Sequence, residues 1–298
     1  MIATTDYELV TESAGLVDRS DRAKFFVRGG EAADFLQGQV SNDVETLEPG
    51  TGCYATVLSH KGKLRTDLRV LRGEDWFWLD TEAIGHAVLE HMLRTYSLGR
   101  DVQYEDVTET RALLSLLGPA ARERLDAAPP DGEHSFVTGE HGIYVATLLG
   151  VDVISEPGTP LDVEPVAEEV AECLRIEAGR PRLGFDMGSE TMPQEAGINE
   201  RAVSFTKGCY VGQETVARLH YRGKPNRHLR GLRLSQPVER GTEIVLQGKE
   251  VGRLGSTCVS PRLGPIALAI VRREAEPGAT VEVGTASAEV VELPFRPG

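Results

Sequence analysis

The pattern of apolar and polar positions divides the chain into a long first part, where helices and strands alternate, and a last part of short strands. In the first 110 residues, short apolar runs bounded by turn residues predict strands over 24–30, 52–58, 64–71 and 76–80. Apolar positions at helical spacing predict helices over 31–39 and 81–95.

The same alternation continues from residue 111 to residue 206. Strands are predicted over 111–117, 143–149 and 150–154, with a short helix ending near residue 125. This mixture of elements favours an α+β or α/β fold.

A helix predicted over residues 165–178 carries an acid on its apolar face. Gly179 and the proline after it are typical of a helix end. Glu177 continues the apolar stripe formed by Val166, Val170, Cys173 and Leu174. A carboxylate on an inward face needs a partner. The partner is either Arg180 or Arg182 nearby, or a ligand with two adjacent N–H donors.

The last part of the chain predicts an antiparallel barrel. Six short strands are expected, over 229–234, 243–246, 251–257, 266–271, 280–283 and 288–293. Short strands at this spacing are typical of a small barrel. We therefore expect a barrel over 222–298 and, over 1–221, two α+β subdomains that divide near 110–118.

The composition narrows the classes of partner. The formal net charge is −14, from 46 acidic and 32 basic residues. This balance argues against nucleic acid as the main partner, because a phosphate backbone requires a basic surface. An acidic surface also suits very high salt, which gives the hypothesis of a halophilic source. Unchanged stability between low salt and molar KCl would contradict it.

No apolar run is long enough to span a membrane and no leader is evident, so we expect a cytoplasmic protein.

The cysteines and histidines do not suggest a metal centre. The four cysteines are far apart, at Cys53, Cys173, Cys209 and Cys258. Zinc sites and stable iron–sulfur clusters normally need closely spaced thiolates, and a disulfide framework is unusual in the cytosol. The seven histidines show no metal-type spacing.

The predicted strand over 64–71 carries a candidate for chemistry. Over residues 64–70 the apolar residues occupy even positions, so Asp67 shares the opposite face with Arg65 and Arg69. From the residues alone, an ion pair on a solvated sheet face is the favoured interpretation. The other is a carboxylate beside a substrate amine, where it holds the amine, accepts its proton or stabilises an iminium.

Residues 207–214 read Lys-Gly-Cys-Tyr-Val-Gly-Gln-Glu, an unusual concentration of glycine, thiol, phenol and charge. The glycines indicate a bent backbone that approaches something closely, and the run from Gln213 to Leu219 predicts a short helix. If Lys207 lies near Cys209 in the fold, its ammonium favours the thiolate and makes the cysteine reactive. The alternative is a tight turn with Cys209 as a small buried filler. The residues do not decide between the two.

This octapeptide resembles the signature of the YgfZ-type folate-binding proteins, relatives of the glycine-cleavage T-protein. Further segments resemble the same superfamily, at residues 14–20, 35–43, 54–58, 61–63, 67–70, 175–179 and 193–196. With the predicted barrel, the resemblance covers essentially the whole chain. It implies a T-protein-like multidomain fold with a C-terminal antiparallel β-barrel and tetrahydrofolate, or a one-carbon derivative, as cofactor.

The resemblance also implies roles for individual residues. Asp67 is expected to face the folate nitrogens and Glu177 to bind the pterin ring. Cys209 is expected to act as a redox or transfer thiol. Further contacts with the cofactor are expected from Tyr54, Lys207, Tyr210 and Arg218. On this view an early strand, the end of one helix and the 207–214 loop converge on one pterin-sized cavity.

Three functions follow from the resemblance. The first is a folate-binding protein that supports assembly or repair of iron–sulfur client proteins, favoured by the octapeptide and by the Lys-Gly-Lys at 61–63. The second is a tetrahydrofolate-dependent aminomethyltransferase acting with a lipoyl carrier protein, favoured by Asp67. The third is a non-catalytic folate-binding scaffold.

Overall fold

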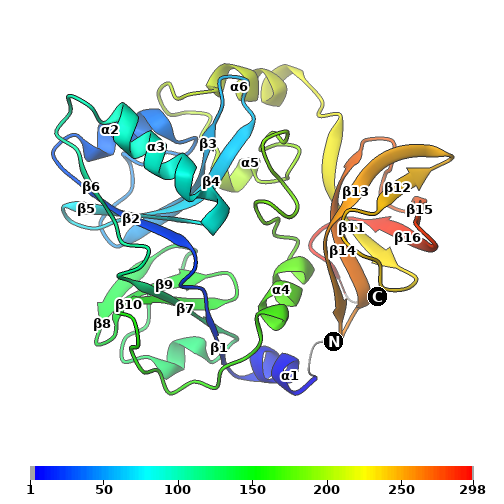
Figure 1. Ribbon diagram of the computed structural model, residues 1–298, viewed down its shortest axis with the longest axis horizontal. Coiled ribbons are helices and arrows are strands. Elements are labelled where there is room, and N and C mark those ends of the chain that lie inside the picture. The colour runs from blue at the N-terminus through cyan, green and yellow to red at the C-terminus, as the bar shows by residue number, and fades with distance from the viewer. Residues whose placement is uncertain (1–3, 297–298) are drawn as a thin grey trace.

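The computed structural model describes residues 4–296 and shows two sheets and a barrel arranged around a central column of helix and loop (Figure 1). The first sheet is antiparallel, with the strand order β3-β4-β5-β2-β6. Its strands are β2 (Ala23–Arg28), β3 (Thr51–Leu58), β4 (Leu64–Arg72), β5 (Trp76–Thr81) and β6 (Gln103–Asp106). Helices α2 (Ala32–Gln39) and α3 (His86–Tyr96) cover one face of it.

The burial of this face follows from the alternation of side chains along β4. Leu68 and Val70 are buried in one apolar cluster with Phe35 and Leu36 of α2 and with Leu89 of α3. Because successive side chains of a strand point to opposite faces, Asp67 and Arg69 are directed to the other side of the sheet. The core therefore fixes which β4 residues face the centre of the molecule.

The second sheet lies beside the first and has the order β1-β7-β10-β9-β8. Its strands are β1 (Gly15–Asp18), β7 (Ala112–Leu117), β8 (Phe136–Gly139), β9 (Gly142–Thr147) and β10 (Gly150–Ser155). Strand β7 is buried along its whole length. A six-residue buried strand between two neighbours is what its apolar run, interrupted by Ser115, predicts.

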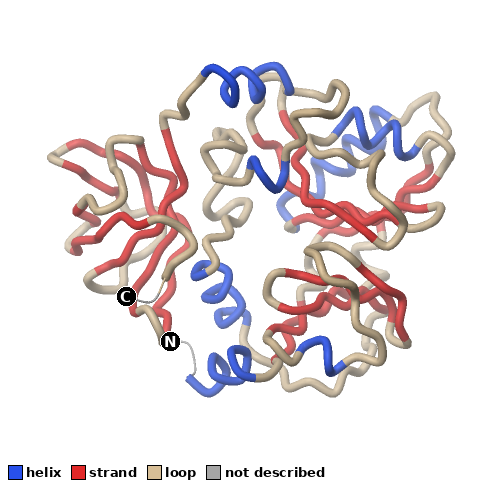
Figure 2. The backbone as a smooth tube through the Cα atoms, turned by 180° about the vertical axis from the view of Figure 1, so that it is seen from behind, coloured by secondary structure: helices blue, strands red, loops and turns tan. Residues whose placement is uncertain are grey.

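The remaining helices connect the sheets to the barrel. They are α1 (Thr4–Glu12), α4 (Glu168–Glu177), α5 (Asn199–Ala202) and α6 (Gln213–Arg222). Figure 2 shows the same arrangement from behind, with the α4 column between the two sheets and the barrel. Helix α4 packs against β1 and against two barrel strands, β13 and β14.

The C-terminal strands close into a barrel of order β11-β14-β13-β12-β15-β16, with β16 paired to β11. They are β11 (Arg227–Leu234), β12 (Glu243–Leu246), β13 (Lys249–Ser260), β14 (Gly264–Arg272), β15 (Thr280–Val283) and β16 (Ala286–Val291). The barrel interior is filled by aliphatic side chains, among them Leu232, Ile244, Val271 and Val290. The prediction of an α+β fold with a C-terminal antiparallel barrel is confirmed.

Two helix starts differ from the sequence prediction. The backbone around Pro165 pairs with β1 instead of opening α4: Leu16 donates to the Glu164 carbonyl, and Val166 donates back to Leu16, both at 2.8 Å. Tertiary pairing thus delays α4 to Glu168. Likewise, Thr81 ends strand β5 and α3 begins at His86.

Five elements were missed by the sequence analysis, namely α1, α5, β1, β6 and β8. Strand β6 has no buried residue, so it lacks the apolar signal on which the prediction depends. The division at residue 222 stays a prediction. Within residues 4–296, no helix combines the length and hydropathy that crossing a membrane requires.

Candidate functional site

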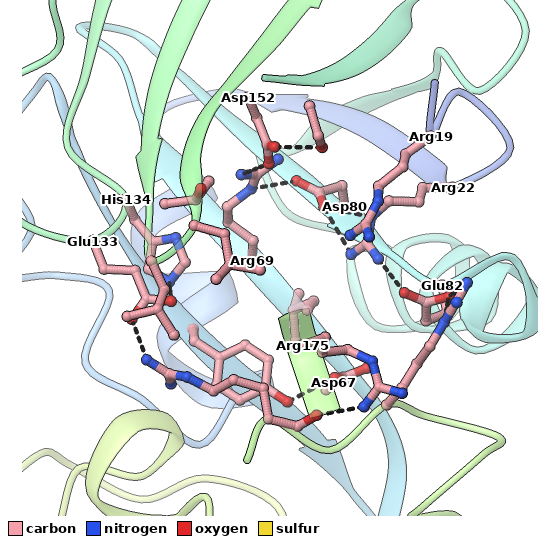
Figure 3. Close-up of a pocket in the computed structure, with 18 of the residues that line it drawn as sticks. Arg19, Arg22, Asp67, Arg69, Asp80, Glu82, Glu133, His134, Asp152 and Arg175 are labelled. Carbon is pink, nitrogen blue, oxygen red and sulfur yellow. Dashed lines mark hydrogen bonds and ion pairs between the residues drawn. The ribbon is translucent and has the colours of Figure 1, made fainter. Parts of the chain in front are cut away.

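A cavity of about 210 Å³ lies where the two sheets meet the segment that follows α4 (Figure 3). Its charged and polar lining comprises Arg19, Arg22, Tyr54, Asp67, Arg69, Asp80, Glu82, Ser115, Glu133, His134, Thr147, Asp152, Arg175, Arg180, Arg182 and Arg201. The apolar part consists mainly of leucines from β4, β7 and the β9–β10 turn. Two sheets that each bury one face on their own cores thus present their polar faces to one space.

Asp67 and Tyr54 form the pair with the clearest chemical character. The Tyr54 hydroxyl donates a 2.6 Å hydrogen bond to Oδ2 of Asp67 from the neighbouring strand. Burial raises the pKa of Asp67, although the Tyr54 hydrogen bond and the charge of Arg22 act in the opposite direction. Burial and the Asp67 carboxylate also raise the pKa of Tyr54 well above its usual value, so Tyr54 stays a donor. This pair presents an acid that can exchange a proton in a confined site.

Beside this pair, a second acid, Asp80, is ionised at neutral pH. Asp80 accepts hydrogen bonds from Arg69 at 2.7 Å, from Arg22 at 2.9 Å and from Trp78 at 2.9 Å. Burial alone would raise the pKa of Asp80, but Arg69 and Arg22 lower it to about 2. Arg69 also donates to Asp152 at 2.6 Å. The pKa values of two carboxyl groups in one cavity are therefore shifted in opposite directions, up for Asp67 and down for Asp80.

The rim of the cavity is organised around Glu133. Its carboxylate pairs with Arg180 at 3.1 Å and with Arg201 at 3.4 Å. The Arg201 guanidinium also lies over the Tyr54 ring, 4.7 Å from its centroid. Burial and the charge of Arg69 lower the pKa of the neighbouring His134 to about 4, so this imidazole is neutral at pH 7.

The cavity is positively charged although the protein as a whole is acidic. Seven arginines and five carboxylates line it, against a net charge of −14 for the chain. Arg69, Arg180 and Arg201 each keep a buried N–H group without a hydrogen-bond partner among the described residues. Because buried donors are normally paired, these groups suit a ligand that brings acceptors or negative charge.

A second hollow of about 620 Å³ adjoins the first. The two share Leu148, Leu149, Arg180, Pro181 and Arg201 in their linings. Further out, Leu229, Leu293 and Pro294 make the second hollow more apolar, and Arg230 adds another cation. Together the two spaces suit an elongated ligand with a polar end in the inner cavity.

Glu177 does not line this cavity. As predicted, it is buried, with 5% of its surface exposed. Its carboxylate is bonded by Tyr7 at 2.8 and 3.0 Å, by Ser260 at 2.5 Å and by Arg262 at 2.9 Å. The partners come from α1 and the barrel, not from Arg180 or Arg182. The expectation that Glu177 and Asp67 share one cavity is wrong, because the acid is used to join α1, α4 and the barrel.

Lys207 does not line the cavity either. Its ammonium donates to the carbonyls of Gln37, Val40 and Asn42 at 2.6–2.8 Å, at the end of α2. An ammonium has three donors, so none is left for the Cys209 thiol. Burial lowers the pKa of Lys207 to about 8, which leaves it mostly protonated at pH 7. Lys207 therefore anchors the loop rather than activating the thiol.

The rest of the 207–214 loop packs on the β3–β4 turn. Gly212 has a φ of 84°, and a Cβ there would lie 2.5 Å from the Ser59 carbonyl oxygen. Cys209 is exposed, so the interpretation as a buried filler is wrong. Neither Cys209 nor Tyr210 nor Arg218 lines the cavity.

Tyr210 and Arg218 have other surroundings. Tyr210 is buried against the Lys207 ammonium, and Arg218 is exposed and pairs with Glu214 at 2.8 Å. Of the predicted site residues, the cavity thus brings together only Asp67 and Tyr54.

Several cavity residues were not found from the sequence. Arg22, Glu133, His134, Arg180 and Arg201 come from loops and short elements far apart in the chain. An unusually high ratio of arginine to lysine was the available signal, but it does not identify positions. In residues 4–296 no group of three or more histidine, cysteine, aspartate and glutamate side chains forms a candidate metal site.

Two domain models of one protein family match this chain, one over the region of the first sheet and one over the barrel. The model described as GCVT N-terminal domain matches residues 2–138. The model described as glycine cleavage T-protein C-terminal barrel domain matches residues 227–296. The chain belongs to the glycine-cleavage T-protein superfamily.

Individual relatives agree with this assignment. The chain is 29% identical to an aminomethyltransferase of Prosthecochloris aestuarii, over 97% of this chain and 90% of that protein. It is also 29% identical to a putative chloroplastic transferase of Arabidopsis thaliana, over 94% of this chain and 71% of that protein. The crystal structure of glycine cleavage system aminomethyltransferase T from Bartonella henselae matches with a TM-score of 0.88 and 23% identity. That match covers 98% of this chain and 89% of the other, and it shows the fold.

Proposed function

We propose that this protein binds tetrahydrofolate, or a one-carbon derivative of it, in the cavity between the two sheets. The observation that carries the proposal is the Asp67–Tyr54 pair inside an arginine-rich space. A pterin is rich in N–H donors and ring acceptors. Its donors suit the Asp67 carboxyl group, and its acceptors suit the buried N–H groups of the arginines that lack a hydrogen-bond partner. The outer hollow, with Arg180, Arg201 and Arg230, suits the aromatic linker and carboxylates of the folate.

The chain's own residues supply a defined chemistry at this site. Bound folate would supply the nucleophilic nitrogens that carry the one-carbon unit. Asp67 is placed to hold a folate nitrogen and to accept or return its proton. Tyr54 orients Asp67 through its hydrogen bond. Asp80 of β5 pairs with Arg69 of β4 and with Arg22 just before β2, and so holds the strands beside it in place. The Arg201 ring contact keeps Tyr54 in place.

We further propose that the folate is used in a YgfZ-type role, in support of iron–sulfur protein assembly or repair. The support is the 207–214 loop, which Lys207 anchors so that an exposed thiol, Cys209, stands at the surface. An exposed thiol on an anchored loop can meet a client protein, whereas a thiol in the cavity could not. The partners on this account are folate and iron–sulfur client proteins.

The second candidate is tetrahydrofolate-dependent aminomethyl transfer from a lipoyl carrier protein. It is favoured by Asp67 and by relatives that are aminomethyltransferases. In that reaction the aminomethyl carbon passes to folate as methylene-tetrahydrofolate, and ammonia and the carrier's thiol leave.

One pair of experiments distinguishes the two roles. Purified protein is incubated with tetrahydrofolate and an aminomethylated lipoyl carrier, and methylene-tetrahydrofolate is measured. Formation of this product rejects the purely supporting role. In cells, Cys209→Ser is expected to reduce the activity of iron–sulfur enzymes, whereas full activity would show that an exposed thiol is not needed. A Cys53→Ser variant, whose thiol is half-buried in the first sheet, serves as the control.

A further inference from the structure

Two cysteines that belong to different parts of the fold meet at the joint between helix α4 and the barrel. The Cys173 Sγ on α4 lies 3.3 Å from the Cys258 Sγ on β13, although 85 residues separate them. Both are free thiols in this structure. A disulfide bond is about 2.05 Å long, so the two sulfur atoms need to approach by little more than about 1 Å.

The surroundings hold these two sulfur atoms in register. Two residues further along α4, Arg175 donates a 2.7 Å hydrogen bond to Ser256 of β13. At the end of the helix, Ser260 of β13 donates to Glu177 at 2.5 Å. Three contacts therefore fix α4 against β13, at Ser256, Cys258 and Ser260 of the strand. Along the strand, the thiol pair lies between the two hydrogen bonds. The pair is set by the packing of secondary structure rather than by a flexible loop.

The two thiols differ in access. Cys173 is fully buried, whereas Cys258 is half-buried and borders two apolar clusters at the joint. The contact with Cys258, burial and the Glu177 carboxylate all raise the pKa of Cys173. Cys258 is thus the thiol that an external reagent meets first, and Cys173 is the one that follows.

We propose that Cys173 and Cys258 form a reversible thiol–disulfide exchange site that reacts with low-molecular-weight disulfides and, when oxidised, joins helix α4 covalently to the C-terminal barrel. In the first step the Cys258 thiolate attacks one sulfur of the small disulfide. The S–S bond of the reagent breaks, one small thiol leaves with a proton, and Cys258 carries a mixed disulfide.

The second step closes the bond within the protein. Cys173 loses its proton to the Glu177 carboxylate, whose Oε1 lies 3.6 Å from its sulfur, and attacks Cys258 Sγ. The second small thiol leaves and takes up that proton. Overall, two cysteine thiols are oxidised, and one small disulfide is reduced to two thiols. The process needs no metal and does not depend on which ligand fills the cavity.

The site differs from the other two cysteines. Cys209 is exposed on the 207–214 loop, and Cys53 is half-buried in the first sheet, with its pKa raised by burial to about 12. Neither contacts a second thiol among the described residues. Among the four cysteines, all within the described residues, Cys173 and Cys258 are the two whose sulfur atoms are in contact.

The test uses the full-length protein with oxidised glutathione as the probe. In the Cys209→Ser variant, peptide mapping after alkylation is expected to show a Cys173–Cys258 crosslink without bound glutathione. Because the crosslink closes a long loop, the thermal midpoint should rise by about 5 °C and return when dithiothreitol is added. Folded protein that keeps both thiols free under prolonged excess oxidant would overturn the proposal.

Two matched variants test the order of the steps. Cys173→Ser lacks the second thiol, so glutathione should remain attached to Cys258. Cys258→Ser lacks the first, so Cys173 should stay reduced. Circular dichroism and the midpoint of each reduced variant establish that it is folded. Glutathione that remains on Cys258 in a protein that still contains Cys173 would contradict the second step. The mapping of Cys209→Ser decides the proposal even if one of these variants does not fold.

Discussion

Tyr54 and Asp67, on neighbouring strands of the first sheet, are joined by a 2.6 Å hydrogen bond in which the phenol donates to the carboxylate. The bond selects one orientation of Asp67 and leaves its Oδ1 without a side-chain partner among the described residues. Tyr54 thus engages one oxygen of the Asp67 carboxyl group, and Asp67 lines the cavity. This relationship underlies the proposal that Asp67 faces the nitrogens of a folate.

Asp67→Asn is predicted to stabilise the free protein at neutral pH. Burial raises the pKa of Asp67, so the unfolded chain ionises first as pH rises, and the charged form costs the folded state stability. The cost begins above the unfolded pKa of about 3.9 and is absent below it. The thermal midpoints of the two proteins should be compared from pH 3 to pH 8. The difference between them should grow as the pH rises. A variant that is less stable at pH 7 would contradict the assigned direction.

Asp80→Asn is predicted to destabilise the protein by about 3–5 kcal/mol, because it leaves Arg69 and Arg22 buried with incomplete charge compensation. The pKa of Asp80 is lowered to about 2, so its contribution is complete above pH 4 and is lost as the pH falls towards 2. Denaturant unfolding at pH 7 and pH 3 measures both effects. The control is Asp75→Asn, at an exposed turn position, which should change little. Equal effects of the two variants would refute the role of Asp80.

Lys207→Met should cost about 2–4 kcal/mol, because three backbone carbonyls at the end of α2 lose their charged donor. Lys249→Met, at an exposed position of the barrel, is the matched control. Hydrogen exchange is expected to increase in α2 and in the 207–214 loop. If the thiol pKa of Cys209 rose in the variant while stability stayed the same, Lys207 would be an activator of the thiol and not an anchor.

Glu177→Gln is predicted to affect stability and not ligand affinity. The change removes the charge that Arg262 pairs with and weakens the bonds from Tyr7 and Ser260, at a cost of about 1–3 kcal/mol. Tyr7→Phe removes the other side of the same contact, so the double variant should lose less than the sum of the two. A tenfold weaker affinity for tetrahydrofolate with unchanged stability would place Glu177 at the ligand after all.

The sequence predicted well what depends on local pattern. The barrel strands, the α2 and α4 helices and the inward position of Glu177 all follow from the period of apolar residues. The face shared by Asp67 and Arg69 follows from the alternation along β4. The octapeptide and the neighbouring segments indicated the superfamily, because their residues are specific in order and type.

The sequence could not predict which distant groups would meet. Glu177 appeared free to bind a ligand because Tyr7 lies 170 positions away and Ser260 lies 83 positions away. Lys207 appeared close to Cys209, but its side chain reaches α2, where backbone carbonyls carry no sequence signature. For the same reason, the sequence does not predict the pairing of Cys173 with Cys258. Convergence of this kind is decided by packing, not by spacing.

Asp67 is proposed to face a folate bound between the two sheets. Calorimetric titration of tetrahydrofolate into wild type, Asp67→Asn and the exposed control Asp75→Asn tests this placement. We expect saturable binding at one site in wild type and in the control, and affinity weaker by at least about tenfold, or about 1.4 kcal/mol, in Asp67→Asn. Absence of binding to the wild type, or equal affinity in all three proteins, would contradict it.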